Sequence, residues 1–463
     1  MRVPAVLVSV LAIITAVSAT AAAPADIRKE LSSYMEARVR ANDFSGTVLV
    51  KLGSERLLVQ GYGLANREWA IPNTPTTRFR LGSLTKAFTA TLILQLNERG
   101  EVDLNAGICS YLSSCPKAWQ PVTVHQLLTH TGGIPSFTDD PEFVAEGRDP
   151  RRRTPDQLIA LIKDRPLEFA PGSDWHYSNA GYYLLGRIIE RVSGRSYETT
   201  ATEQIFQPLG MKSSGYDHAD AILEQRASGY AVQDGRVINV PPRDVGWADA
   251  AGALYSTVLD LEKWDEALYS DRVLTERSRL RMWTPVRQHY GYGWGIFSGK
   301  DSTDGQLQIT HDGGIDGFNA HISRFPQSRA LVIVLANRED ARANVVGQAL
   351  ASILFHQPYD RPVQPLSRVD RATLDRWVGT YEVQASGRWE VTHDGDRLVV
   401  RVPDISERQK FELTPVSPDR FRLEDLQVDV EFLSVAGGPA TGIKVQQGEK
   451  TRSGARVATR PTR

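Results

Sequence analysis

Hydrophobic and polar positions follow several different patterns along this chain. Near its start, apolar residues at helical spacing predict an amphipathic helix over residues 25–41. Two runs with strand-like alternation come next, at 45–53 and 55–65. A longer apolar pattern then predicts a buried helix that ends at about Arg99, where Gly100 supplies a stop.

Strand patterns return only after a long helical region. Up to about Leu223 the chain has short helical patches separated by proline and glycine, and a final helix is predicted over 341–355. For the Gly-aromatic run 290–295 we favour core packing of a sheet strand, with lining of the substrate cleft as the alternative. Strands at both ends with helices between them favour an α+β fold, with an antiparallel sheet flanked by helices and an inserted helical subdomain. The later strand-like runs are 289–297, 307–311, 318–326 and 330–337.

A proline-rich segment divides the chain into two domains. Residues 26–357 form the larger predicted domain, and 358–370 read as a linker. Beyond it, short alternating runs with a turn dipeptide at Asp394-Gly395 predict a small antiparallel β domain, barrel-like, over 371–463 with a basic tail.

The first 25 residues resemble a secretory signal peptide. Arg2 precedes an apolar run that is too short to span a membrane, and small residues follow it. We expect cleavage after Ala21 or Ala25. The mature protein is therefore predicted to be exported, to the periplasm or outside the cell, without an integral membrane span.

The net charge, the cysteines and the histidines indicate which partners, crosslinks and metals to expect. The net charge of -1 gives no reason to expect a nucleic-acid partner. The two cysteines, Cys109 and Cys115, are predicted to form a disulfide, which an exported compartment permits. No metal or other cofactor is expected, because the nine histidines are scattered without metal-ligand spacing.

The candidate nucleophile lies at the start of the first buried helix. Ser83 and Lys86 are three positions apart, and residues at this spacing share one face of a helix. Lys86 can therefore reach the Ser83 hydroxyl, while the helix N-terminus favours an oxyanion beside it. Partial burial should lower the pKa of Lys86 and let it activate the serine. A second S-x-x-K, Ser114 to Lys117, contains a proline and no helix pattern follows it.

Two further motifs carry groups that suit acyl-transfer chemistry. Tyr177 and Asn179 precede a predicted helix and can present a phenol and an amide to a cleft. His311 ends a predicted strand, and Gly313 and Gly314 allow a ligand to approach the strand edge closely.

The order S-x-x-K, Y-x-N and H-x-G resembles the serine β-lactamase and penicillin-binding-protein superfamily, in its class C β-lactamase, D-aminopeptidase and esterase branch. The stretches LLTHTGGIP, HYSNAGYYLLG and AGALYSTVLDLEKW also look like that branch, and the resemblance covers residues 28 to 355. It implies that Ser83 is acylated and that Lys86 and Tyr177 share the proton transfers. Tyr177 is then the favoured base, with Lys86 lowering its pKa, although the first proton acceptor stays open.

The same resemblance assigns the remaining site residues. Asn179 would orient the acyl-side amide, and the backbone N–H groups of Ser83 and Gly314 would form the oxyanion hole. His311 stands where the family has a lysine that suits a substrate carboxylate, and it should be largely neutral near pH 7. If Asp312 faces the cleft, its charge also disfavours a carboxylate, so a neutral or amine-bearing amide or ester fits better.

Three functions follow from this reading. The first is an exported serine hydrolase acting on short peptides, amides or esters, including those with D-residues and material from the cell wall. The second is a β-lactamase or D-alanyl-D-alanine carboxypeptidase, against which the missing lysine counts. The third is a sensor that is acylated once without turnover.

Overall fold

The computed structural model describes residues 24–140, 143, 153–233, 236–241, 244–361, 369–403, 410–423, 428–435, 438–447 and 450–457. Nearly all of the predicted signal peptide, most of the linker and the end of the basic tail lie outside these described residues. Pro24 and Ala25, which we assigned to the signal peptide, begin helix α1 (Pro24–Arg40). Within the described residues, no helix is long and apolar enough to cross a membrane.

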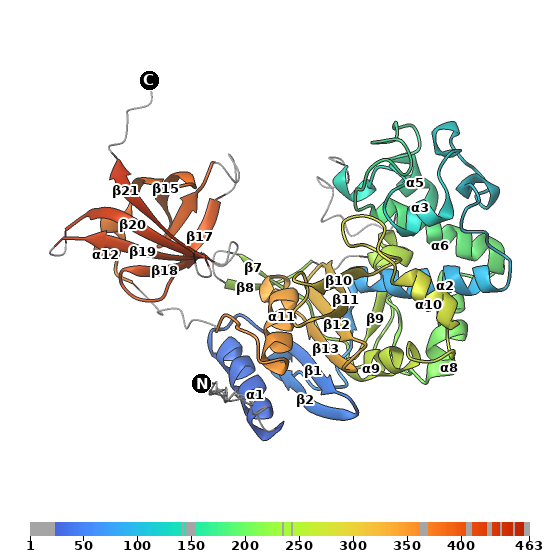
Figure 1. The fold of residues 1–463 in the computed structure, drawn as a ribbon, viewed down its shortest axis with the longest axis horizontal. Helices are drawn as coiled ribbons and strands as arrows, with labels where there is room; N and C mark the ends of the chain where they lie inside the picture. Colours follow the sequence, from blue (N-terminus) through green and yellow to red (C-terminus); the bar gives the residue numbers. More distant parts are fainter. Residues whose placement is uncertain are drawn as a thin grey trace, which may run out of the picture.

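A six-stranded antiparallel sheet forms the centre of the larger domain (Figure 1). Its strand order, β10-β11-β12-β13-β1-β2, pairs the first predicted strands with those that are far along the chain. Val48 of β1 lies opposite Val334 of β13, for example. The six strands are β1 (Gly46–Leu52), β2 (Glu55–Tyr62), β10 (Gly295–Gly299), β11 (Gly305–Ile315), β12 (Phe318–Phe325) and β13 (Ala330–Ala336).

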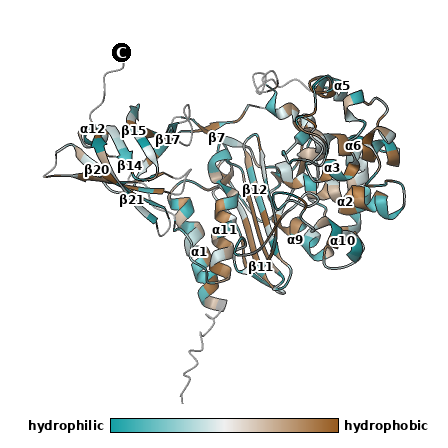
Figure 2. Ribbon diagram, turned by 45° about the horizontal axis from the view of Figure 1, so that its top comes forward, coloured by the Kyte–Doolittle hydropathy of each residue, from teal (hydrophilic) through white to brown (hydrophobic). Residues whose placement is uncertain are grey.

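Each face of this sheet buries its own hydrophobic core. Ile333 of β13 belongs to the core shared with the inserted subdomain, whereas Val332 and Val334 belong to the core under α1 and α11 (Ala343–Leu354). This follows from the alternation of side chains along a strand. In Figure 2, α11 lies against the sheet and carries hydrophobic residues.

The inserted subdomain lies on the other side of the sheet (Figure 1). Its long helices are α2 (Thr85–Glu98), α6 (Asn179–Ser193) and α9 (Val258–Ala267). Cys109 and Cys115 are joined in a disulfide there, with a Cα–Cα distance of 5.3 Å. The shorter helices and turns of the larger domain are η1 (Gly82–Leu84), η2 (Ile108–Ser110), η3 (Lys117–Trp119), α3 (Val124–Leu128), η4 (Phe137–Asp139), α5 (Pro155–Ala160), α7 (Tyr197–Ala201), η5 (Thr202–Phe206), α8 (Gln207–Leu209), η6 (Val245–Trp247), η7 (Asp249–Ala251), α10 (Glu276–Met282) and η8 (Glu339–Ala341). Its short strands are β3 (Leu64–Asn66), β4 (Ile71–Pro72), β5 (Phe79–Arg80), β6 (Gly215–Tyr216), β7 (Tyr230–Gln233), β8 (Arg236–Asn239) and β9 (Leu254–Ser256).

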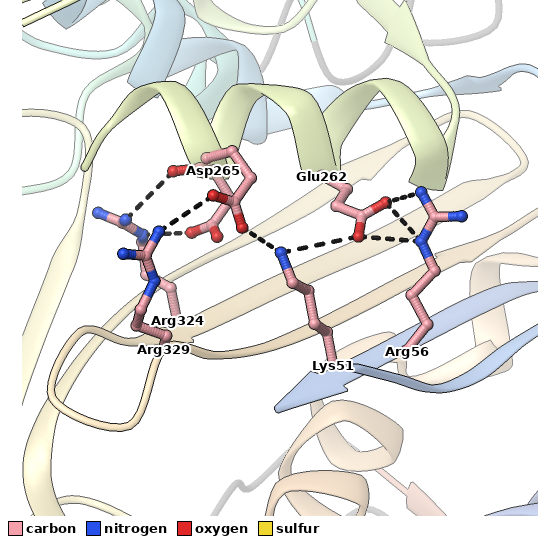
Figure 3. A network of polar contacts seen from close by, with 7 residues as sticks. Lys51, Arg56, Glu262, Asp265, Arg324 and Arg329 are labelled. Carbon is pink, nitrogen blue, oxygen red and sulfur yellow. Dashed lines mark hydrogen bonds and ion pairs between the residues drawn. The ribbon is translucent and has the colours of Figure 1, made fainter. Parts of the chain in front are cut away.

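Helix α9 is attached to the sheet by charged side chains (Figure 3). Asp265 accepts a hydrogen bond from Arg324 Nε at 2.7 Å, and both side chains are buried. Glu262 is paired with Arg56 at 2.6 Å, and Lys51 contacts Glu262 at 3.8 Å. Arg329 and Lys51 also contact Glu266. The helix that follows β9 is therefore fixed against β1, β2 and β12.

The C-terminal region is a closed antiparallel barrel, in which the first strand pairs with the last. Trp377 of α12 (Arg371–Trp377) stacks on Phe432 at 5.2 Å in its core. The predicted α+β fold with a small β domain is thus confirmed. The barrel strands are β14 (Gly379–Val383), β15 (Gly387–Asp394), β16 (Arg397–Arg401), β17 (Lys410–Pro415), β18 (Arg420–Leu423), β19 (Val428–Ser434), β20 (Ala440–Gln447) and β21 (Lys450–Val457).

Candidate active site

Ser83 lies in the tight turn η1, between strand β5 and helix α2. The preceding Gly82 has a φ of +53°, a conformation that favours glycine. A Cβ on Gly82 would also come within 2.8 Å of the Gly314 nitrogen. This glycine therefore allows the serine turn to pack directly against β11. Ser83 itself is half-buried, so a substrate can reach its hydroxyl.

Lys86 is fully buried beneath Ser83, with 0% of its surface exposed. Its Nζ lies 3.0 Å from Ser83 Oγ, 2.8 Å from Asn179 Oδ1 and 2.9 Å from the Ala251 carbonyl oxygen. Burial lowers the pKa of Lys86 well below its ordinary value, because the ammonium loses its hydration. In the neutral form, Nζ donates to Asn179 and Ala251 and accepts from the Ser83 hydroxyl. The arrangement suits a general base for Ser83.

Tyr177 lies just before helix α6, with its ring centroid 4.8 Å from Lys86 Nζ. Burial raises its pKa, and the Asp312 charge adds to this rise, while a hydrogen bond with Ser83 opposes it. The net pKa of Tyr177 therefore lies above its ordinary value, whereas we expected it to be lowered. A phenol with a raised pKa keeps its proton at neutral pH, so Tyr177 is better suited to give a proton than to take the first one.

Asn179 is the first residue of α6, and both the oxygen and the nitrogen of its side-chain amide are hydrogen-bonded. Its Oδ1 accepts from Lys86, and its Nδ2 donates to Thr138 Oγ1 at 3.1 Å. The backbone N–H of Asn179 also donates to Ser136 Oγ at 3.1 Å. The amide that we expected to orient the substrate is thus engaged in holding Lys86.

The third motif lies on β11, beside the serine turn. His311 is 8% exposed, and its Nε2 is 2.9 Å from the Tyr290 hydroxyl. Burial and the nearby Lys86 charge lower the pKa of His311 to about 4, so its ring is neutral at physiological pH. A Cβ on Gly313 would meet the Leu81 carbonyl oxygen at 1.9 Å, which explains why a glycine is needed there. Gly314 also packs against the turn, which brings its backbone close to that of Ser83.

Comparison with known proteins now identifies the family. Residues 31–354 match the Beta-lactamase family model. The chain belongs to the beta-lactamase family. It is 31% identical over 431 residues to penicillin-binding protein 4* of Bacillus subtilis (strain 168), covering 88% of this chain and 93% of that protein.

Two solved structures extend this beta-lactamase-family likeness. The octameric penicillin-binding protein homologue from Pyrococcus abyssi has a TM-score of 0.67 and 26% identity, over 92% of this chain and 99% of that one. The D-amino acid amidase from Ochrobactrum anthropi SV3, complexed with L-phenylalanine amide, has a TM-score of 0.62 and 25% identity, over 72% of this chain and 99% of that one. The protein is therefore a hydrolase of the beta-lactamase fold, related to penicillin-binding proteins and D-amino acid amidases.

Asp312 does not join the other residues of this beta-lactamase-family site. Because side chains alternate along β11, His311 points toward Ser83 while Asp312 points to the opposite face of the sheet. Asp312 Oδ1 bonds His321 Nδ1 at 2.6 Å, and His321 contacts Gly347 of α11. The Asp312 side chain is 61% exposed on that face. Its carboxylate therefore cannot contact a substrate bound at Ser83, contrary to the hypothesis based on the sequence.

Several aromatic residues complete the site without any motif of their own. Tyr290 contacts His311, so the interpretation of its Gly-aromatic run as core packing of a strand is wrong at this position; β10 begins only at Gly295. The His130 ring packs against the Tyr177 ring, with ring centroids 4.3 Å apart. It belongs to the LLTHTGGIP stretch, which carried a family signal but no assigned role.

The charge in the described part of the site is sparse. Among the described residues, no three histidine, cysteine or acidic side chains gather in a way that could hold a metal ion. His130 and His311 both have lowered pKa values because of burial, and both are neutral. The described residues of the third motif thus provide no permanent cation for a substrate carboxylate.

Proposed function

We propose that this protein is an exported serine hydrolase that cleaves amide or ester bonds of small substrates through an acyl-enzyme on Ser83. The observation that carries the proposal is the fully buried Lys86, whose Nζ lies 3.0 Å from Ser83 Oγ and is held by two further acceptors. Stability does not explain an amine in this position, because burying a lysine destabilises the folded protein. It fits the activation of a serine nucleophile.

The proposed reaction has two halves. Ser83 Oγ attacks the substrate carbonyl carbon and gives its proton to neutral Lys86, while the backbone N–H groups of Ser83 and Gly314 stabilise the oxyanion. The bond between the carbonyl carbon and the leaving group then breaks, and the leaving amine or alcohol takes a proton from Tyr177. Tyr177 regains its proton from Lys86. In the second half, Lys86 is neutral again and takes a proton from the water that attacks the acyl carbonyl carbon. That proton passes to Ser83 Oγ as the acid leaves.

The substrate class follows from the neutral third motif. Because His311 is uncharged, a carboxylate of the kind in penicillins or D-Ala-D-Ala ends finds no permanent cation there. The relation to a D-amino acid amidase supports an amino-acid amide. We assign Asp139 as the carboxylate for the substrate amine, because it follows Thr138, whose hydroxyl bonds Asn179. Asp139 Oδ2 lies 4.0 Å from His176 Nε2.

The test is the hydrolysis of D-alanyl-p-nitroanilide against its N-acetyl form and its L-isomer. We expect turnover of the free-amine D-substrate, its loss in Ser83→Ala, and a selective loss of free-amine preference in Asp139→Asn. Activity that survives in Ser83→Ala would rule out the proposed reaction. A preference for the N-acetyl form would return the assignment to a carboxypeptidase or esterase.

Two alternatives are separated by further substrates. The relation to a penicillin-binding protein favours the second alternative. A β-lactamase would turn over benzylpenicillin rapidly, and a carboxypeptidase would release D-alanine from a D-alanyl-D-alanine peptide. A sensor would instead retain one equivalent of acyl group on Ser83, visible by mass spectrometry, without releasing product. Export is tested by fractionating cells and sequencing the mature N-terminus, which we expect after residue 21 or 25.

A further inference from the structure

His130 lies behind Tyr177 and contacts the chain on both sides of it. The His130 carbonyl oxygen accepts from the His176 N–H at 3.1 Å, and its ring Nδ1 accepts from the Ser178 N–H at 3.1 Å. The ring itself packs against the Tyr177 ring, with centroids 4.3 Å apart and the ring planes tilted by 36°. The residues immediately before and after Tyr177, and its side chain, are thus held by one histidine.

The protonation of His130 follows from these bonds. Because Nδ1 accepts a hydrogen bond from a backbone N–H, the ring proton must be on Nε2. Among the described residues, that Nε2 has no hydrogen-bond partner, although His130 is only 2% exposed. Leaving a buried donor unpaired costs stability, which a residue kept only for packing would avoid. The backbone of His130 is also left-handed, with φ at +58°, a conformation that is unfavourable for most side chains.

We propose that His130 is a positioning residue, which fixes Tyr177 at the proton-transfer position beside Ser83 and Lys86. It acts through Tyr177 and does not itself touch the reacting atoms. The inference rests on the proposed hydrolase function and adds a residue to it. Asn179 is not the target, because Ser136, Thr138 and Lys86 already hold it.

The alternative is that His130 only fills space among aromatic rings. Its ring centroid is 4.7 Å from that of Tyr290, 5.1 Å from Tyr182 and 6.0 Å from Trp175. Two substitutions separate the alternatives. In His130→Asn, the Oδ1 stands where Nδ1 was, so the bond from Ser178 is kept, and asparagine tolerates a left-handed backbone. In His130→Gln, the acceptor is one bond farther out, and the bond is lost although more volume is filled.

The experiment measures kcat, KM and the rate of Ser83 acylation with D-alanyl-p-nitroanilide, whose leaving amine needs the proton that Tyr177 gives, together with the melting temperature of each variant. We expect His130→Asn to keep most of the wild-type kcat. We expect His130→Gln to lose about a hundredfold in kcat and acylation rate, with KM little changed, since a misplaced catalytic group can cost this much. Equal kcat values for the two variants, or an order that follows melting temperature, would show a packing role and overturn the proposal.

A double-mutant cycle with Tyr177→Phe provides the second test, on variants whose melting temperatures show that they are folded. If His130 acts through Tyr177, then His130→Gln should cost nothing further in kcat once the phenol is absent. Additive losses would contradict the proposal. Ser83→Ala keeps the two proposals distinct: if it is as active as wild type, the hydrolase assignment fails, whereas a failed cycle with a required Ser83 removes only the role of His130.

Discussion

Lys86 is an amine held where its charge is costly, and its titration should therefore be visible in catalysis. Only the neutral amine can take the Ser83 proton, so kcat/KM should rise with pH as Lys86 deprotonates. Because burial lowers its pKa, the midpoint should lie well below the ordinary lysine value. A pH profile with D-alanyl-p-nitroanilide measures it. A midpoint near the ordinary value would contradict the role of burial.

Substitution of Lys86 gives the matching control. We expect Lys86→Arg to lose about a thousandfold in kcat, because a guanidinium stays protonated and general-base catalysis contributes about this much. Lys117, the exposed lysine of the second S-x-x-K, serves as the comparison. Lys117→Arg should leave the profile unchanged.

The neutral third motif makes a second prediction at this scale. His311→Lys should place a cation at the position that has none, and so lower KM for benzylpenicillin relative to the free-amine anilide. A charge-assisted hydrogen bond contributes about 1.5–3 kcal/mol, so the relative change should be tenfold or more. Asp312→Asn is the control on the opposite face of β11, and it should leave the ratio of the two substrates unchanged. A shift in that ratio would place Asp312 back in the cleft.

Among the secondary-structure elements, α9 depends on a buried ion pair with β12. Both Asp265 and Arg324 are almost wholly inaccessible, and burial raises the pKa of Asp265 although Arg324 opposes this. We expect Arg324→Met to lower the free energy of unfolding by about 3–5 kcal/mol, because it leaves Asp265 buried without its partner. Urea denaturation measures this loss. The double variant Arg324→Met with Asp265→Leu should recover much of it.

The pH dependence of that variant has a definite sign. Without Arg324, the Asp265 pKa is raised further in the folded state, so the folded protein binds more protons than the unfolded chain does. Stability then falls as pH rises and increases toward acid pH. The deficit of Arg324→Met should therefore shrink as Asp265 becomes protonated. A deficit independent of pH would show that Arg324 acts by packing on Trp283 and Tyr269 instead.

The sequence predicts local relations better than those between distant elements. The contact between Ser83 and Lys86 could be predicted from the sequence because one helical turn sets their spacing. The α+β class followed from strand patterns at both ends of the domain. Nothing local, however, brings Tyr177 or His311 to Ser83, and only the family pattern connected them.

Other parts of the site needed the register of the sheet and long-range packing. The direction of Asp312 depends on how β11 aligns with β12 and on which face α11 covers. The Ala251 carbonyl and the ring of His130 are fixed by loops that approach from elsewhere in the chain. A backbone oxygen has no sequence signal, and a single histidine has a weak one. The pKa of Tyr177 was misjudged for the same reason, since its burial depends on these loops.

At the scale of the whole molecule, the barrel has a hydrophobic core of its own. Trp377, Phe432 and their neighbours form one cluster, and none of these residues belongs to either core of the larger domain. A contact that reaches back from the barrel is the ion pair of Arg422 with Asp360, at 2.9 Å. Separate hydrophobic cores favour two cooperative units.

Calorimetry can therefore assign the two units by single substitutions. Trp377→Ala removes a side chain that is 1% exposed and stacked on Phe432, and it should destabilise the barrel by about 3–5 kcal/mol. We expect one of two thermal transitions to fall, with anilide hydrolysis at 25 °C unchanged. Ile333→Ala, in the sheet of the larger domain, should lower the midpoint temperature of the other transition. Anilide hydrolysis by this variant should decrease at temperatures close to that midpoint. If either substitution shifts a single common transition, the barrel and the catalytic domain fold as one unit, and the barrel would then contribute to the stability of the active site.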